Sequence, residues 1–343
     1  CDVLLPDGST RLSLVIENDR MYTKAAPVLT ALDDGQTPWS LEREEVLLKI
    51  SLAGIFEDAL GQADPETTSL IVLNVLPEEP YLTADQRLMM EKPRQILSGF
   101  RILLSLFPSA DGVICLEEGG VIQGRDTAEK TRQHLMGLME EDAERTTVSF
   151  FKNVYPLAHP KLLSLRLKRQ RKNKDRDCQI FSVQEALAVY EAVVEGKVPE
   201  PTVVTVGGDC ILAPKNFRVR IGTSMDYVVS RCGHTTRRPK KLQQGGPLTG
   251  RELSSLSGPV TRSTKGMLLF SSEYLGKEAS AACLHCGRCA EACPMNLEPY
   301  RKDADLSSCL HCSSCSYVCP AKRNLTQSIR SMRRLILNSR RRA

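Results

Sequence analysis

Eight cysteines between Cys283 and Cys319 form two copies of one twelve-residue pattern. The copies read "CLHCGRCAEACP" (Cys283–Pro294) and "CLHCSSCSYVCP" (Cys309–Pro320), and counterparts lie 26 positions apart. Clustered thiols in a chain without a visible export signal favour a reducing compartment and metal binding over disulfides. Thiolates are soft ligands that suit iron–sulfur clusters or zinc.

Each copy has the spacing C-x2-C-x2-C-x3-C-P. In two-cluster ferredoxins the first three cysteines of such a run bind one cluster, and the fourth binds the other. We therefore expect two [4Fe–4S] clusters. The predicted ligands are Cys283, Cys286, Cys289 and Cys319 for the first cluster, and Cys309, Cys312, Cys315 and Cys293 for the second. Zinc is the alternative, but zinc sites usually need only four ligands from two C-x2-C pairs.

The residues between these cysteines give weaker evidence for clusters. Gly287, Ser313 and Ser314 are small, which allows backbone N–H groups to approach cluster sulfurs and influence the potential. His285 and His311 occupy equivalent positions, and we expect both to point to solvent rather than to tune a cluster. Clusters whose irons are all bound to cysteine typically pass single electrons and make no bonds.

Length and composition are those of a soluble globular protein with two or three domains. The chain has 343 residues, 41% hydrophobic and 25% charged, which is enough to bury sizeable cores. The longest apolar runs, such as Leu70–Leu76, are too short to span a bilayer, and no signal peptide is visible. Because the sequence begins with Cys1, we expect it to be processed or trimmed. We expect a cytoplasmic protein.

The first 200 residues alternate between helical and strand patterns, which predicts an α/β domain with a largely parallel sheet. Capping boxes are expected at Thr83 with Gln86 and at Ser182 with Glu185. The expected elements are a helix over 41–60, a strand over 68–76, a helix from Thr83 broken at Pro93, a strand over 112–118, a helix over 128–141, the strand "TTVSFF" and a helix over 183–195.

After Pro201 the sequence predicts a small β-rich module. "TVVTVGGD" and "FRVRIG" have strand character, and a short helix is expected over Ser224–Ser230. Gly245–Thr264 is rich in Gly, Pro, Ser and Thr and predicts a linker. The stretches "GGD" and "GGPLTG" lack the context of a dinucleotide fingerprint and are interpreted as turns.

Charged runs and scattered cysteines are given structural interpretations. The basic run Arg166–Arg176 has no interleaved aromatic residues, so we expect a solvated loop and no nucleic-acid binding. We expect Cys115 in a buried strand. Three more cysteines are interpreted as structural because nothing nearby in sequence lowers their pKa: Cys178, Cys210 and Cys232.

The net charge of +5 is concentrated at the C-terminal end, where eight Lys and Arg and no acid follow Pro320. The segment Asn324–Arg342 has an amphipathic helical pattern. Such a helix can dock on a membrane subunit or an acidic partner, and alone it gives peripheral attachment on the cytoplasmic side of a membrane. A solvated helix end is the alternative interpretation.

Taken together, these pieces resemble the C subunit of the Rnf electron-transport complex and its relatives. The relatives include the cobalamin-reductase protein of propanediol-utilisation microcompartments and the proline-reductase-associated electron-transfer protein. The matching stretches, besides the cysteine motifs, are "EEPYLTADQRLMMEKP" (Glu78–Pro93), "ALAVYEAVVEGKVP" (Ala186–Pro199), "VVTVGGD" (Val203–Asp209), "RVRIGT" (Arg218–Thr223) and "GGPLTG" (Gly245–Gly250).

The resemblance implies an α/β domain like that of the NADH-binding flavoprotein subunit of respiratory NADH dehydrogenases, a β-grasp module of the SLBB type and a helical two-cluster ferredoxin domain. In this family NADH reduces FMN, and the clusters carry the electrons away. The expected boundaries are 1–40 for the remnant of an N-terminal barrel (its end at Leu12–Asn18) and a linker, 41–200 for the α/β domain, 201–244 for the SLBB-like module, 245–280 for a linker, 281–324 for the cluster domain and 325–343 for the basic tail.

The sequence departs from the family pattern where a flavin would bind. The family's glycine-rich loop cradles phosphate with backbone N–H groups. Here that stretch reads "AGIFEDALGQADPE" (Ala53–Glu66), which lacks the glycine cluster and carries Glu57, Asp58, Asp64 and Glu66. We therefore expect the FMN and NADH sites to be degenerate.

Two further family stretches are altered in the same direction. "NVLPEEPY" (Asn74–Tyr81) has Pro77 and Glu78 where relatives have an acid and a cysteine. "YPLAHPK" (Tyr155–Lys161) lacks the glycines of its counterpart. Both losses weaken the expectation of a flavin.

Three functions remain. The leading hypothesis is an electron-transfer subunit that relays electrons between partner proteins of a complex through two [4Fe–4S] clusters. The second is a complete NADH-oxidising FMN and iron–sulfur flavoprotein. The third is a scaffold with structural clusters.

Overall fold

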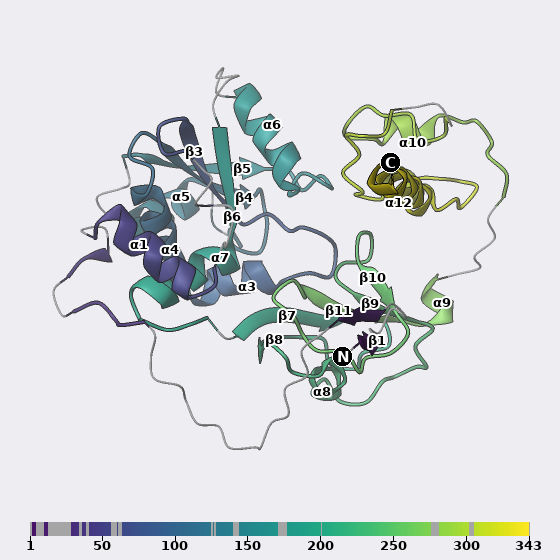
Figure 1. Ribbon diagram of the computed structural model, residues 1–343, viewed down its shortest axis with the longest axis horizontal. Coiled ribbons are helices and arrows are strands. Elements are labelled where there is room, and N and C mark those ends of the chain that lie inside the picture. The colour runs from purple at the N-terminus through teal and green to yellow at the C-terminus, as the bar shows by residue number, and fades with distance from the viewer. Residues whose placement is uncertain are drawn as a thin grey trace.

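The computed structural model describes residues 2–4, 10–12, 29–33, 36–38, 41–55, 60, 64–124, 126, 128–139, 144–170, 177–199, 201–275, 281–301 and 305–342. Within them lie an α/β domain, a second sheet with short helices, and a region that carries the cysteine repeat (Figure 1). Two short strands, β1 (Asp2–Leu4) and β2 (Thr10–Leu12), pair antiparallel at the N-terminal end. The expected barrel segment after Leu12 lies outside the described residues.

The α/β domain is built on a four-stranded sheet in which every pairing is parallel. Its order is β5 (Thr146–Phe151), β4 (Asp111–Glu117), β3 (Thr68–Asn74) and β6 (Asp177–Ser182). The chain runs outward from β3 through β4 to β5 and then returns to place β6 on the other side of β3. The direction of winding therefore reverses between β3 and β6, which is where open α/β sheets usually bind ligands.

Alternating side chains of the strands pack on the two faces of this sheet, as the period of two requires. Ile71 and Leu73 contribute to one core, while Leu70 and Val72 contribute to the other. The first face is covered by α1 (Arg43–Leu52), α4 (Pro93–Ser105), α5 (Ala128–Met139) and α7 (Val183–Val193). The second face is covered by α6 (Pro160–Gln170).

Helix α6 corrects the first part of the expected loop at Arg166–Arg176. Residues 166–170 belong to α6, whose Leu163 and Leu167 are buried against the sheet, and residues 171–176 lie outside the described part. The sequence did not reveal this helix because basic residues are concentrated in its last turns, where Arg166 and Arg169 are exposed. Strand β6 was missed because its burial is partial over most of its length.

One of the two expected capping boxes is confirmed. At the start of α7, the Ser182 hydroxyl accepts from the Glu185 N–H, and the Glu185 carboxylate accepts from the Ser182 N–H. The box expected at Thr83 before α3 (Ala84–Glu91) is wrong, because the Thr83 side chain caps nothing. Its hydroxyl bonds to Asn216 of the second sheet instead. The predicted break at Pro93 is confirmed, since α4 begins there.

The second sheet is mixed and has the order β10 (Arg251–Leu253), β9 (Lys241–Gln244), β11 (Gly266–Phe270), β7 (Pro201–Gly207) and β8 (Lys215–Arg220). Helix α8 (Met225–Ser230) packs on it, and α9 (Ser272–Leu275) follows it. The expected linker over 245–280 is therefore corrected. Strand β11 lies at the centre of the sheet and is wholly buried, so the module extends to Phe270.

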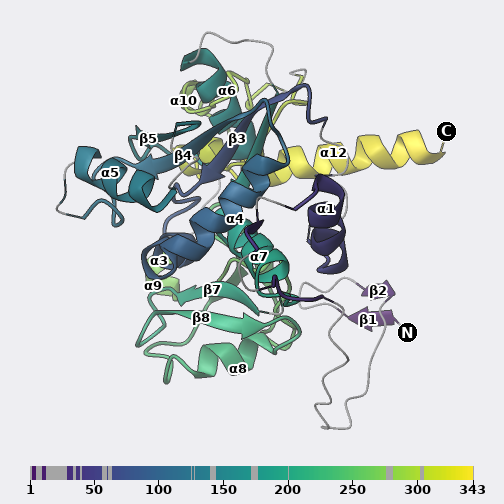
Figure 2. The same ribbon diagram turned by 90° about the vertical axis from the view of Figure 1, so that its left-hand side faces the viewer.

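The region of residues 281–342, here called the cysteine-repeat region, contains α10 (Arg288–Glu291), α11 (Ser314–Tyr317) and α12 (Leu325–Arg342). The views in Figures 1 and 2 place it beside the α6 end of the α/β domain. The two short helices start and end 26 positions apart, so the sequence repeat is also a structural repeat. Of the helices that the structure describes, none is long and apolar enough to cross a membrane.

The packing of α4 on α7 depends on a glycine. A Cβ on Gly99 would lie 1.9 Å from the Ala186 carbonyl oxygen, so Gly99→Ala must push two helix backbones apart. We expect the free energy of unfolding to fall by roughly 2–4 kcal/mol, measured by urea denaturation. Gly137→Ala in α5 is the matched control. Its Cβ meets nothing within 4 Å, and we expect a gain of about 0.5–1 kcal/mol. Equal effects at both positions would contradict the packing argument.

Candidate metal centres and the pocket at the sheet edge

Two small hollows in the cysteine-repeat region are each lined by four cysteines. The first has an empty volume of about 370 Å³ and the second about 360 Å³, counting space open to solvent. The first is lined by Cys283, Cys286, Cys289 and Cys319, and the second by Cys293, Cys309, Cys312 and Cys315. These are the two sets predicted from the spacing, with three cysteines of each from one copy and the fourth from the other.

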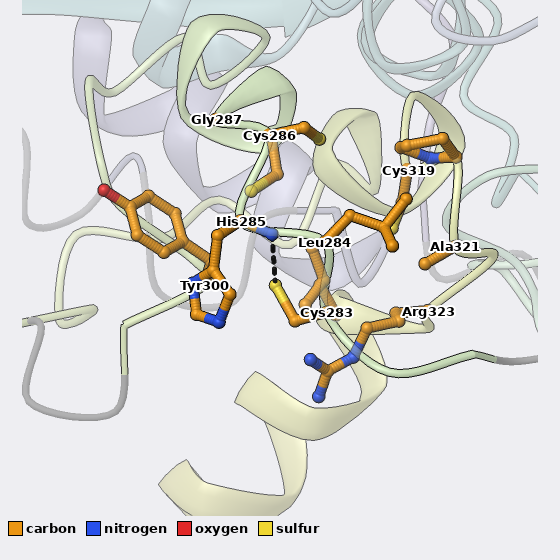
Figure 3. Close-up of a pocket in the computed structure, with 12 residues that line it drawn as sticks. Cys283, Leu284, His285, Cys286, Gly287, Tyr300, Cys319, Ala321 and Arg323 are labelled. Atoms are coloured by element: carbon orange, nitrogen blue, oxygen red, sulfur yellow. Dashed lines mark hydrogen bonds between the residues drawn. The ribbon is translucent and has the colours of Figure 1, made fainter.

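Left-handed backbone conformations shape both loops in the same way. His285 and Gly287 in the first copy, and His311 and Ser313 in the second, all have positive φ between 51° and 77°. These turns direct the His285 N–H to the Cys283 sulfur at 3.4 Å (Figure 3). The His311 N–H points to the Cys309 sulfur at the same distance. The expectation that backbone N–H groups approach ligand sulfurs is met, although the donors belong to the histidines.

The thiols in these hollows are shielded from water to different extents. Burial raises the pKa of the Cys289, Cys309 and Cys315 thiols. Because metal ligands must be thiolates, a metal centre has to displace these protons and supply the missing positive charge. The hollows are otherwise lined mainly by apolar residues and backbone, so four thiolates without a metal would be strongly unfavourable there.

The donor set fits an iron–sulfur cluster. Four cysteines surround each hollow and a backbone N–H group approaches a sulfur in each, which are features of cluster sites. Among the described residues, no three His, Cys, Asp or Glu side chains converge closely enough to hold a single metal ion. A cubane distributes its four cysteines over four iron atoms, so its ligands surround a volume rather than meet at a point.

The histidines of the two copies have different surroundings. His285 is exposed, as expected, with its ring 6.5 Å from that of Tyr300. The expectation for His311 is wrong. Its ring is half-buried, and its Nε2 lies 2.9 Å from the Arg333 guanidinium of α12. Burial, reinforced by Arg333, lowers the pKa of His311, so this side chain is neutral at neutral pH.

A larger cavity lies at the reversal point of the parallel sheet, with an empty volume of about 1410 Å³ including open space. Asn74 and Ser182, paired in register at the ends of β3 and β6, line it. Thr202 of the second sheet and residues 262–265, which precede β11, also line it. The stretches that depart from the family's flavin pattern adjoin this cavity.

The described lining of this cavity fits a phosphate poorly. The first turn of α7 is occupied by its own Glu185 carboxylate through the capping box. Of the two cations, Lys265 is paired with Glu78, and Arg262 donates to the Gly54 carbonyl. Asp85 adds a further acid. A phosphate bound at these described residues would therefore have to displace internal partners.

Glu79 is a structural residue that sequence reasoning missed. It stands in the retained part of "NVLPEEPY" and joins the α/β domain to the second sheet. Its carboxylate accepts from the Leu248 N–H at 2.7 Å, from the Thr249 N–H at 3.1 Å and from the Thr249 hydroxyl. The stretch Glu78–Pro93 contains Glu79, and "GGPLTG" contains its partners Leu248 and Thr249. That both stretches match the family is the signal that could have paired them.

The remaining interpretations of turns and cysteines agree with the structure. "GGD" and "GGPLTG" form turns, and Asp209 accepts from the Ser271 N–H at 2.9 Å. Cys115 is buried in β4. Burial raises the pKa of Cys178 to about 11 and also raises the pKa of Cys210 and Cys232, so none of these thiols is an activated nucleophile.

The family described as the Nuo51 FMN-binding domain matches residues 59–190, and the SLBB domain family matches residues 203–252. The NAD+-reducing [NiFe]-hydrogenase in its H2-reduced state has a similar fold. Its TM-score is 0.55 at 17% identity, over 69% of this chain and 48% of that one. These matches indicate the class of protein: an α/β domain similar to the FMN-binding domain of Nuo51, followed by a module similar to SLBB domains.

Similar curated proteins indicate the class of protein more narrowly. The chain is 28% identical to the C subunit of the ion-translocating oxidoreductase complex of Rhodobacter capsulatus, over 81% of this chain and 57% of that protein. It is also 28% identical to the C subunit of the proton-translocating ferredoxin:NAD(+) oxidoreductase complex of Clostridium ljungdahlii, over 70% and 51%. The chain is thus similar to the C subunit of the Rnf complexes, and it spans about half the length of the curated relatives it matches.

The cavity makes a prediction about pH. Burial, opposed by the Gln184 amide that donates to it at 2.8 Å, raises the pKa of Asp85 to about 6. Because this pKa exceeds the unfolded value of about 4, the folded state binds the proton more tightly, and stability is lost as pH rises from about 4 through 6. Asp85→Asn should therefore raise the free energy of unfolding by roughly 2 kcal/mol at pH 7.5.

The measurement is the difference in thermal midpoint between Asp85→Asn and the wild type at pH 7.5 and pH 5. Comparison at one pH cancels effects common to both proteins. The advantage of the variant should be smaller at pH 5. A constant advantage, or one that grows on acidification, would contradict a raised pKa.

Proposed function

We propose that this chain relays single electrons through two [4Fe–4S] clusters, as part of an oxidoreductase related to the Rnf complexes, in the position of their C subunit. The observation that carries the proposal is the pair of hollows, each lined by four cysteines drawn from both copies of the repeat. In this proposal Cys283, Cys286, Cys289 and Cys319 hold the first cluster, and Cys293, Cys309, Cys312 and Cys315 hold the second. Residues 281–324 then act as a two-cluster ferredoxin-like domain.

The residues around the hollows suit one-electron transfer. Each bound cluster would accept and release one electron, and the chain supplies thiolates, N–H donors and partial shielding from water. Helix α12 supports the second loop, because the Arg333 guanidinium donates to the Ser307 and Cys309 carbonyls. Such support keeps the loop in place when the charge changes, which favours rapid transfer.

The α/β domain acts in this proposal mainly as a scaffold. Support comes from the lining of the cavity, where Glu185 caps its own helix and Glu78 pairs with Lys265. Electrons then enter and leave through partner proteins of a complex. Attachment to a membrane subunit through α12 belongs to the same proposal.

A second candidate is an NADH-oxidising FMN flavoprotein. The match of residues 59–190 to an FMN-binding domain family and the cavity at the sheet edge favour it. In that case electrons would enter from NADH within this chain rather than from another protein.

Cofactor analysis of anaerobically purified protein separates these candidates. We expect about eight iron and eight sulfide per chain, as two cubanes require, and no flavin. Dithionite should reduce both clusters, which EPR would detect. Stoichiometric FMN with bleaching of the clusters by NADH would favour the second candidate. Clusters that dithionite does not reduce would indicate a purely structural role.

Paired cysteine substitutions test the crossed ligand sets. Cys283→Ala with Cys319→Ala removes two ligands of one proposed cluster, so about four iron should remain. Cys309→Ala with Cys319→Ala removes one ligand from each, so little iron should remain if one missing thiolate suffices to lose a cluster. The two variants lack the same number of cysteines, which makes each the control of the other. The reverse result would assign Cys319 to its own copy.

A further inference from the structure

The two copies of the repeat share a backbone but differ in what covers them. In the first copy Leu284 is 64% exposed, and Cys286 is exposed. Their counterparts 26 positions later are Leu310, which is half-buried, and Cys312, which is buried. Since sequence and local conformation are nearly the same, the difference comes from neighbouring parts of the chain.

Two side chains cover the second copy. The Tyr155 hydroxyl, from the loop after β5, donates to the Cys312 carbonyl at 2.5 Å. Arg333 of α12 holds His311 and the Cys309 carbonyl from another side. The loop of Tyr155 also reaches the edge of the parallel sheet, where the Asn74 amide donates to the Ala158 carbonyl at 2.9 Å. The second hollow is therefore the inner one.

No comparable cover is found over the first copy within the described residues. Figure 3 shows Leu284, His285 and Cys286 around the first hollow, with Arg323 beside Cys283. A ligand cysteine at the surface, next to a large exposed apolar side chain, brings a cluster within reach of another protein. The first hollow is therefore the outer one.

Positive charge surrounds this outer loop. Arg288 and Lys322 are exposed and Arg323 is half-buried, and the described residues give none of the three an ion-pair partner. Glu291 is the exposed acid of the same short helix, and Glu298 nearby is paired with Arg301, so cations outnumber acids among the described residues here. Complementary charge steers the encounter of two proteins and orients them.

We propose that the face formed by Leu284, His285, Cys286, Arg288, Lys322 and Arg323, here called the port face, docks an acidic one-electron carrier protein. This inference rests on the proposed function and specifies the surface at which electrons enter or leave the chain. One electron passes between the carrier's redox centre and the first cluster, so the carrier is oxidised as the chain is reduced, or the reverse. No bond is made or broken. The inner cluster exchanges electrons with the first.

Binding in the oxidised state provides the test, with an acidic [2Fe–2S] ferredoxin as the probe and a basic cytochrome c as its opposite. Calorimetry at low ionic strength should give micromolar or tighter affinity for the ferredoxin alone, and this affinity should fall steeply as salt is raised to about 0.2 M. The triple variant Arg288→Gln, Lys322→Gln, Arg323→Gln should bind about tenfold or more weakly.

The matched control removes the same charge from the second sheet and its loops, with Lys215→Gln, Arg238→Gln and Lys240→Gln, all at exposed positions. It should bind within about twofold of the wild type. Equal weakening in both variants, or a preference for the cytochrome, would refute the port face. Binding to anionic vesicles that the port variant alone loses would assign the face to a membrane instead, and would also refute it.

A third variant tests the apolar contact. Leu284→Ser removes an exposed side chain, so folding should be unaffected, while ferredoxin affinity should fall severalfold. Dithionite reduction of every variant, followed by EPR, tests the relay separately. Normal reduction with unchanged binding overturns the docking inference alone. A wild type without reducible clusters overturns the proposed function, and the binding data still decide whether the face docks an acidic protein.

Discussion

A cysteine side chain is short, so four of them can surround one hollow only where several turns of the chain approach closely. In the cysteine-repeat region this is achieved by exchange between the copies: Cys319 lines the first hollow and Cys293 the second. Neither copy could surround a hollow alone. The two short helices contact each other, the left-handed residues shape both loops, and α12 supports the second copy through Arg333.

The other part of the molecule has the topology of a ligand-binding domain, yet its cavity is lined by groups that satisfy one another. Glu185 caps its own helix and Glu78 pairs with Lys265 in this lining. Outside the lining, Glu79 binds the loop of the second sheet. In a domain that binds phosphate, such backbone and cationic groups would be left for the ligand. Here they contribute to the cohesion of two domains, which is consistent with a scaffold role.

Sequence reasoning succeeded where the signal was local. The cysteine spacing indicated which residues lie together, "TTVSFF" gave a strand at its observed bounds, and Ser182 with Glu185 gave a helix start. It failed where a distant partner decides the outcome. Strand β11 looked like linker because its neighbours β7 and β9 are distant in sequence, and Thr83 turned from its own helix to Asn216. The cover that Tyr155 and Arg333 give one copy has no local signal at all.

The exchange of the fourth cysteine also governs the order in which the chain can complete its sites during synthesis. The second set is complete once Cys315 has been made, because its borrowed member, Cys293, comes earlier. The first set begins 26 residues before the second but must wait for Cys319. Both sites are therefore completed within a few residues of each other, and a ribosome that stalls between the copies leaves a chain with neither. With the proposed ligand sets, both sites would thus be completed almost together and late in the repeat, although the sequence looks like two independent motifs.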